Sequence, residues 1–167
     1  MRWASLRNTA RVNLRPARKD EADKLLAIQR AAAVDAFSHI YPPDRYPFPD
    51  DAIREVWAEA LADPAVEVYV AEVDGVPAGA VSVGSGFLST LYVLPVYQGS
   101  GMGSALHDLA LERLRALGFA EAKLWTLEGN ESGRRFYERR GWKLTEETRV
   151  VPYPPYPLDV QYSRVLE

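Results

Sequence analysis

The most constraining feature of this sequence is an apolar strand that runs into a glycine-rich turn and then into a helix. The strand is predicted over Phe87–Leu94 and ends at Pro95, just before Gln98-Gly99-Ser100-Gly101-Met102-Gly103. Apolar residues at helical spacing follow the glycines. Such a turn presents backbone N–H groups at the positive end of a helix, and the missing Cβ atoms let an anion approach them. The segment therefore predicts an α/β fold with a main-chain phosphate site at Gly99–Ser104.

Other phosphate-binding motifs fit this turn less well. The dinucleotide fingerprint requires the spacing G-x-G-x-x-G, whereas the glycines here are Gly99, Gly101 and Gly103. The phosphate loop of nucleotide triphosphatases requires a lysine after its last glycine, and no lysine lies between Lys24 and Lys123. Glycine clusters also form plain loops, so the turn by itself leaves that interpretation open.

The rest of the chain alternates strands and helices, with no internal repeat and no long linker. Asp74-Gly75 accepts positive φ and predicts a hairpin, and Gly118 and Gly141 predict glycine caps at the ends of two helices. We expect residues 9–167 to form one domain, and residues 1–8 to be a disordered extension or an expression remnant. The other predicted strands are Val12–Arg15, Val66–Val73, Ala78–Val83, Ala122–Leu127, Lys143–Val151 and Asp159–Leu166, and helices are expected from about Asp20 to Tyr41 and from Asp50 to Ala62.

Composition bears on which ligands and partners are excluded. The chain has 20 basic and 23 acidic residues and a formal charge of -3, which provides no broad positive field for nucleic acid. Apolar runs are too short to cross a membrane, and no signal-peptide pattern opens the sequence. With no cysteine, and only His39 and His107 as histidines, thiolate chemistry is excluded and no metal site is expected. We expect a cytoplasmic protein without nucleic-acid or membrane partners.

Two motifs indicate a known family. Gln98-x-x-Gly101-x-Gly103 after an apolar strand matches the Q/R-x-x-G-x-G/A motif of the GNAT superfamily of N-acetyltransferases. Further on, Asn130 precedes a helix that ends in Phe136-Tyr137-Glu138-Arg139-Arg140-Gly141-Trp142, which resembles the second signature of the family. Two motifs in the right order are more specific than either alone. With looser likeness in the opening elements, the resemblance covers nearly the whole chain.

The resemblance implies a fold and a co-substrate. The fold is a mixed, mainly antiparallel sheet of about six or seven strands, flanked by about four helices and splayed between its fourth and fifth strands. The co-substrate is acetyl-CoA, with its pantetheine arm in the splay and its pyrophosphate on the glycine-rich turn. The cofactor-binding residues implied in this way are Leu91, Tyr92, Val93, Gln98, Gly99, Ser100, Gly101, Met102, Gly103, Ser104 and Asn130.

Tyr137 is the catalytic residue that the resemblance implies, as the general acid. It follows Asn130 by about two helical turns, so both side chains could face one cleft. A phenol with a pKa near 10 can protonate or hydrogen-bond the departing CoA thiolate, whose thiol has a pKa near 8.5 if it behaves like cysteine. The alternatives are a tyrosine packed for its ring and an asparagine that caps the helix.

The general base stays open. Deprotonating an alkylamine with a pKa of about 10 costs roughly 4 kcal/mol at pH 7. Part of the family uses a glutamate on the fourth strand, but Phe87–Leu94 carries no carboxylate. The candidates are Asp35, His39, Glu128 or a water molecule. His107 lies off the apolar stripe of its helix, and we expect it at the surface.

The sequence therefore predicts an N-acetyltransferase that moves the acetyl group of acetyl-CoA to a primary amine by direct attack in a ternary complex. The amine belongs to a small molecule or a protein, and the tyrosine- and proline-rich loops Tyr41–Pro49 and Pro152–Pro157 are expected either to wall its site or to stiffen turns. The alternatives are a non-catalytic acyl-CoA-binding or sensing module and a structural α/β interaction domain. A homodimer is common among the relatives, although no segment marks an interface.

Overall fold

The computed structural model describes residues 11–167, so the extension predicted for residues 1–8 lies outside the described part of the chain. The strands are β1 (Val12–Pro16), β2 (Val66–Val73), β3 (Val76–Gly84), β4 (Phe87–Val93), β5 (Glu121–Leu127), β6 (Lys143–Val150) and β7 (Leu158–Val165). The helices are α1 (Ala22–Phe37), α2 (Asp50–Ala62), α3 (Met102–Ala116) and α4 (Glu131–Glu138), with a 3-10 turn, η1, at Pro95–Tyr97. These bounds agree closely with the elements predicted from the sequence.

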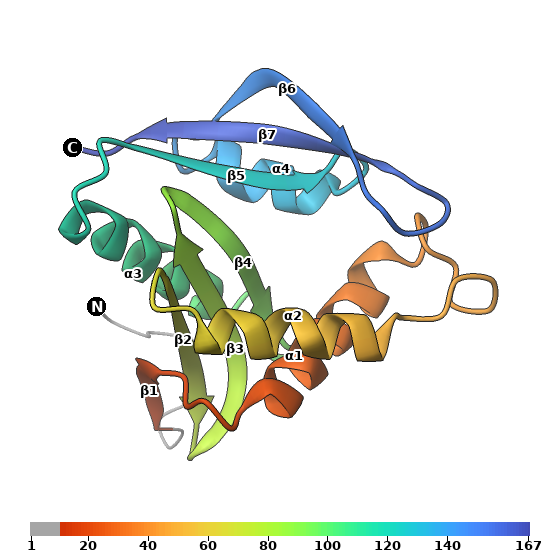
Figure 1. Cartoon of the computed structure of the whole chain (residues 1–167), viewed down its shortest axis with the longest axis horizontal. Coiled ribbons are helices and arrows are strands. Elements are labelled where there is room, and N and C mark those ends of the chain that lie inside the picture. Colours follow the sequence, from red (N-terminus) through yellow and green to blue (C-terminus); the bar gives the residue numbers. More distant parts are fainter. Residues whose placement is uncertain (1–10) are drawn as a thin grey trace.

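The strands form one seven-stranded sheet in the order β1-β2-β3-β4-β5-β7-β6. Every neighbouring pair is antiparallel except β4 and β5, which are parallel and share a single register pair, Phe87 with Lys123. The two strands therefore meet at one end and separate beyond it, and Figure 1 shows the two halves of the sheet diverging. The mixed sheet and its splay between the fourth and fifth strands are confirmed.

Helices cover both faces of the sheet. Successive residues of a strand point to opposite faces, and Val70 and Ala71 of β2 accordingly belong to two separate apolar clusters. One cluster includes Met102 of α3, and the other includes Leu25 of α1 and Trp57 of α2. All five side chains are at most 2% exposed. The sheet, with its splay between β4 and β5, thus carries α3 on one face and α1 and α2 on the other.

The two predicted glycine caps form as expected. At the end of α4, Gly141 has φ of +86° and its N–H donates to the carbonyl of Glu138. The N–H of Trp142 then donates to the carbonyl of Tyr137 at 3.2 Å. This pair of bonds is the Schellman arrangement, which folds the residue after the glycine back onto the helix. The cap therefore brings the Trp142 ring next to the Tyr137 ring, 5.9 Å between centroids.

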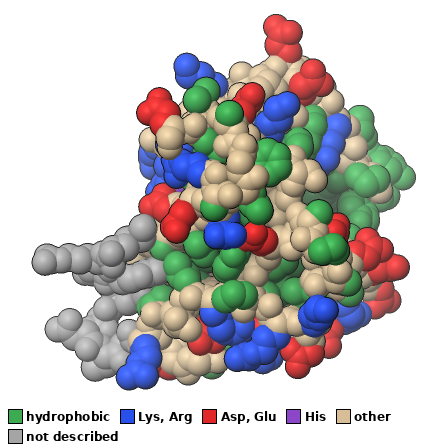
Figure 2. Space-filling view, turned by 60° about the vertical axis from the view of Figure 1, so that its left-hand side comes forward, with side chains coloured by type: hydrophobic (Ala, Val, Ile, Leu, Met, Phe, Trp, Pro, Cys, Tyr) green, Lys and Arg blue, Asp and Glu red, His purple; other side chains and the backbone are tan. Residues whose placement is uncertain are grey.

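The surface carries charges of both signs. Figure 2 shows acidic and basic side chains interspersed over one face of the molecule, in keeping with the small formal charge of -3. Within residues 11–167, no helix combines the length and the apolar character that a membrane span requires.

Candidate active site

The glycine-rich turn leaves backbone donors without partners at the start of α3. Gly101 precedes the helix with φ of +95°, a conformation that side chains with a Cβ rarely adopt, and the space around it is open. The first helical bond runs from the N–H of Ala105 to the carbonyl of Gly101. Within the described chain, the N–H groups of Gly101, Gly103 and Ser104 donate to no protein acceptor. A fifteen-residue helix with free N–H groups at its start favours an anion at this point.

Three elements of the predicted site meet at Gly103. A Cβ atom on this residue would lie 3.6 Å from the Phe136 ring of α4 and 3.9 Å from Val93 of β4. Gln98 folds back so that its Nε2 donates to the carbonyl of Val93 at 3.2 Å. The phosphate turn, the end of β4 and α4 are therefore held together.

Asn130 caps α4, as one of its two predicted roles required. Its Oδ1 accepts from the N–H of Gly133 at 3.1 Å, and its Nδ2 donates to Thr126 Oγ1 of β5 at 3.1 Å. The side chain thereby fixes the start of α4 to the strand that diverges from β4. Its contact with the cofactor stays a prediction.

Tyr137 is half-buried, and its hydroxyl is free. Its ring packs edge-on against Phe136, 5.3 Å between centroids, and against Trp142. Burial, followed by the nearby Tyr92, raises the pKa of Tyr137 above its ordinary value. Nothing within residues 11–167 forms a hydrogen bond with the hydroxyl. Among these residues, Arg164 Nη1 is the one fully buried side-chain polar atom without a partner, so the unbonded Tyr137 hydroxyl must contact solvent. The phenol is neutral at physiological pH and available to a ligand.

The surface position predicted for His107 is wrong, because this side chain is 2% exposed. Trp142 Nε1 donates to His107 Nε2 at 3.0 Å, and His107 Nδ1 lies 3.1 Å from Asp108 Oδ1. An indole N–H is a donor alone, so Nε2 must accept and the imidazole proton must sit on Nδ1. Burial lowers the pKa of His107, partly offset by Asp108. The end of α4 and its cap cover this side of α3, which the apolar spacing of α3 alone did not reveal.

Two arginines of the second motif bond protein groups. Arg134 Nε donates to the hydroxyl of Tyr162 at 2.9 Å, and that hydroxyl donates to Glu138 at 2.7 Å, which ties α4 to β7. Arg140 lies over the Phe136 ring, and its Nη2 donates to Ser104 Oγ at 2.6 Å. Arg140 thus places a positive charge beside the free N–H groups at the start of α3.

The three candidate bases are all exposed. Glu128 lies in the turn that follows β5, and His39 contacts the same turn, because His39 Nε2 donates to the carbonyl of Gly129 at 2.9 Å. Asp35 lies on the outer surface of α1. None of these three side chains is buried within residues 11–167, and their roles as general base stay predictions.

Sequence reasoning missed one buried carboxylate, that of Asp159 on β7. The residue is 7% exposed and accepts a bond from Arg149 Nε at 3.0 Å. Burial first and then the charge of Asp159 raise the pKa of Tyr41, and they raise the pKa of Tyr92 to about 12. The available signal was a single acidic residue among apolar ones, directly after the loop at Pro152–Pro157.

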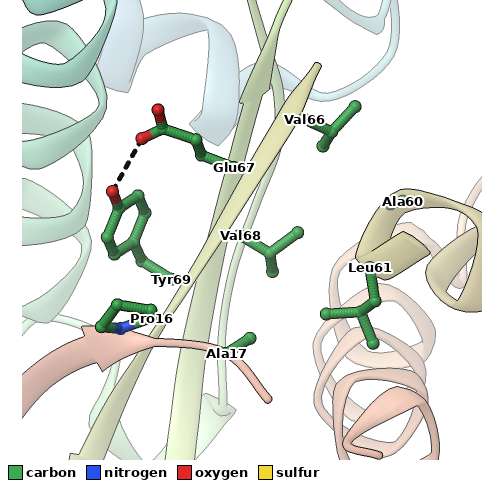
Figure 3. Close-up of a pocket in the computed structure, with 8 residues that line it drawn as sticks. All are labelled: Pro16, Ala17, Ala60, Leu61, Val66, Glu67, Val68 and Tyr69. Atoms are coloured by element: carbon green, nitrogen blue, oxygen red, sulfur yellow. Dashed lines mark hydrogen bonds between the residues drawn. The ribbon is translucent and has the colours of Figure 1, made fainter. Parts of the chain in front are cut away.

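A shallow hollow of about 210 Å³ lies elsewhere, between β2, α2 and the end of β1 (Figure 3). Its main polar groups already have partners, since Glu67 accepts from the Tyr69 hydroxyl and from Arg113. None of the predicted site residues lines it. We therefore assign it no role in the reaction.

Comparison with known proteins defines the class to which this fold and turn belong. Residues 32–142 match the family model described as the acetyltransferase (GNAT) family. The matched segment contains both sequence motifs, the splay of β4 and β5, and Tyr137. The protein is an acetyltransferase by class, and it belongs to the GNAT family.

Individual relatives agree with this assignment. The chain is 29% identical over 154 residues to the peptidyl-lysine N-acetyltransferase YjaB of Salmonella typhimurium, an alignment that covers 88% of this chain and 94% of that protein. The PaiA N-acetyltransferase of Thermoplasma acidophilum, solved with coenzyme A, has a TM-score of 0.76 at 17% identity and covers 93% of this chain and 99% of its own. YncA of Salmonella typhimurium, solved with acetyl-CoA, has a TM-score of 0.70 at 20% identity, covering 94% and 95%. These structures share the fold with this chain.

Proposed function

We propose that this protein transfers the acetyl group of acetyl-CoA to a primary amine by direct attack in a ternary complex. One observation carries the proposal: the free hydroxyl of Tyr137 belongs to the helix whose Phe136 ring lies beside Gly103, at the start of α3 and next to the end of β4. A reaction that breaks the thioester of a phosphate-bearing carrier needs these two groups near each other. The relatives solved with coenzyme A and acetyl-CoA support this choice of carrier.

The cofactor would lie along the open edge of β4. Its pyrophosphate would accept from the N–H groups of residues 99–104, helped by the positive charge of Arg140. Its pantetheine arm would pair with the main chain of Leu91, Tyr92 and Val93, where β5 has moved away. Asn130 would face the same opening from the start of α4. Pairing an extended amide chain with a free strand edge is a common mode of recognition.

The chemistry balances with one protein acid. The neutral amine forms a bond to the acetyl carbon, an N–H of β4 polarises the carbonyl oxygen, and the C–S bond then breaks. The departing thiolate takes the proton of the Tyr137 hydroxyl. The nitrogen of the new amide loses a proton, and water carries that proton to Tyr137, which becomes neutral again. A raised pKa makes the phenolate short-lived, so Tyr137 acts mainly by donating a strong hydrogen bond and by brief proton transfer.

The acceptor amine must arrive neutral, which costs roughly 4 kcal/mol at pH 7 for an alkylamine with a pKa of about 10. We take water as the first recipient of that proton, with His39 and Glu128 at the neighbouring turn as the side chains that could relay it. The name of the Salmonella relative states that it acts on peptidyl-lysine. On that likeness a lysine side chain is the first acceptor to test.

We also propose the setting of this reaction. Residues 9–167 would act as one N-acetyltransferase domain, since the described sheet runs without a break from β1 to β6 in space. The cytoplasm would be its compartment. These two proposals concern the chain as a whole and leave the chemistry unchanged.

The test is release of CoA thiol from acetyl-CoA with a lysine peptide and a panel of small amines. The chain has no cysteine, so it contributes no thiol background. Tyr137→Phe should lower kcat by about 100-fold or more while the Kd for acetyl-CoA changes little, in line with the usual contribution of a general acid. Tyr69→Phe is the matched control and should behave as wild type, because its hydroxyl bonds Glu67 in the hollow beside β2 and α2, which has no role in the reaction. Equal kcat in Tyr137→Phe and wild type would remove Tyr137 from the acid role.

A further inference from the structure

One face of the diverging half of the sheet carries a carboxylate that the proposed chemistry does not use. Tyr162 of β7 bonds Glu138 of α4, so Tyr162 and its alternate neighbour Val160 face that helix. Asp159 and Gln161 therefore face the other way. Asp159 stands opposite Leu127 of β5 in the strand register, near the end of β5 that leads to α4.

The Asp159 carboxylate is mostly buried but only half satisfied. Its Oδ2 accepts from Arg149 Nε at 3.0 Å, whereas nothing within residues 11–167 donates to Oδ1. Oδ1 still touches solvent, since Arg164 Nη1 is the one fully enclosed polar side-chain atom of that range without a partner. Burying this carboxylate to 7% exposure costs desolvation free energy, and a cationic ligand on Oδ1 would offset that cost.

Tyrosines from separate segments share the electrostatic surroundings of this carboxylate. Tyr41 follows α1, Tyr92 belongs to β4, and Tyr153 lies in the loop before β7. Burial first and then the charge of Asp159 raise the pKa of Tyr41 and of Tyr92, and Tyr153 adds to the rise at Tyr41. Aromatic rings beside a carboxylate favour an ammonium group.

Arg149 orients the carboxylate without occupying it. Its guanidinium lies 4.5 Å above the Trp125 ring and gives a single nitrogen, Nε, to Asp159. Its side chain is 55% exposed, so solvent screens much of its charge. Arg149 therefore holds Oδ2 and leaves Oδ1 without a partner among residues 11–167.

We propose that Asp159 binds the ammonium group of the acceptor, and hence that the acceptor is a primary alkylamine, charged in solution, of the kind found on a lysine side chain or a simple alkylamine. This inference rests on the proposed acetyl transfer. The Asp159 carboxylate draws the ammonium into the splay, and the proton leaves to water before the nitrogen attacks.

The experiment compares charged and uncharged nucleophiles. Thiol release is measured at about pH 7.5 with Nα-acetyl-lysine methylamide and butylamine, which are cationic, and with hydroxylamine, which is largely neutral there. Asp159→Asn should lower kcat/KM for the two cationic amines by about 10- to 100-fold and leave hydroxylamine within about threefold, the range expected for losing a bond to a charged group. Glu146→Gln removes the same charge from an exposed site on β6 and should match wild type.

The outcomes distinguish a binding role of Asp159 from a purely structural one. Asp159→Asn should lower kcat/KM for the cationic amines alone, whereas a purely structural ion pair with Arg149 would make Asp159→Asn equally harmful to every acceptor. Equal losses with hydroxylamine, or no loss with the cationic amines, would overturn the inference and leave acetyl transfer intact. No thiol release by wild type with any amine would overturn the transfer itself, and the inference with it. Comparing the lysine derivative with butylamine tells whether the ammonium comes from a peptide or a small molecule.

Discussion

Replacing His107 by leucine should destabilise the protein by about 2 kcal/mol, because Trp142 would keep a buried N–H without an acceptor. Trp142 is 2% exposed, and its Nε1 donates to His107 Nε2 at 3.0 Å. An unsatisfied buried donor costs about 1–3 kcal/mol. Leucine fills a similar volume, so the packing against Phe136 should change little. For a chain of this size, about 2 kcal/mol corresponds to a fall in Tm of about 4–8 °C.

The assay is thermal unfolding at pH 8, followed by circular dichroism, with His107→Gln as the matched control. The glutamine amide oxygen can accept from the indole where Nε2 did, so His107→Gln should recover at least half of the lost stability. Equal Tm values for His107→Leu and wild type would refute the reasoning. So would a loss in His107→Gln as large as that in His107→Leu, because the hydrogen bond would then not be the cause.

The same pair of variants tests the pH dependence. Because burial lowers the pKa of His107 in the folded state, the unfolded chain binds a proton more readily below its own pKa of about 6.5. Wild-type stability should therefore fall as the pH drops from about 6.5 toward the folded pKa, since a proton on Nε2 would face the Trp142 N–H. Arg140 and Arg164 lower the pKa further, and Asp108 opposes them. His107→Gln should lack this component.

Three further predictions concern other parts of the site and the fold. Gly101→Ala should cost about 1–2 kcal/mol of stability through left-handed strain at φ of +95°, and should weaken acetyl-CoA binding by calorimetry about tenfold or more, because the new methyl group stands in the open space over the turn. The bond to Arg15 holds the pKa of Glu21 at about 2, so Glu21 should add to the free energy of unfolding fully above about pH 4.5 and lose this contribution as the pH falls toward 2. Urea unfolding of Glu21→Gln should not show this pH-dependent loss. Arg140→Met should raise the Kd for acetyl-CoA about three- to tenfold, since the bond to Ser104 and a positive charge near the phosphates both disappear; an unchanged Kd would show that Arg140 serves α4 alone.

Local signals made most of the elements predictable. The glycines at positions 101, 118 and 141 adopt positive φ where the sequence placed a turn or a helix end. Asn130 caps the helix that it precedes, and Asp74-Gly75 forms the hairpin. Each of these depends on a few neighbouring residues, so a single sequence suffices. The splay of β4 and β5 came from the family resemblance, since no local pattern tells that β5 pairs with β7.

The residues that sequence reasoning misplaced or missed depend on contacts between distant segments. His107 is buried because Trp142, 35 residues further on, folds back over α3. Asp159 becomes a binding candidate because the fold buries it with only one carboxylate oxygen bonded, and because its charge reaches Tyr41 after α1 and Tyr92 of β4. No periodicity within α3 or β7 encodes those neighbours. The proposed site of the acceptor amine therefore depends on contacts that exist only in the assembled fold.

Titration calorimetry of the purified protein with acetyl-CoA tests the central claim most directly, with ADP and NAD as control ligands. We predict saturable binding at one site per chain, with both controls much weaker and with binding lost in a variant that carries valine at Gly101. Absence of binding by the wild-type protein, or equal binding of ADP and NAD, would contradict the account, because the turn at Gly99–Gly103 would then be architecture rather than the pyrophosphate site of an acetyltransferase.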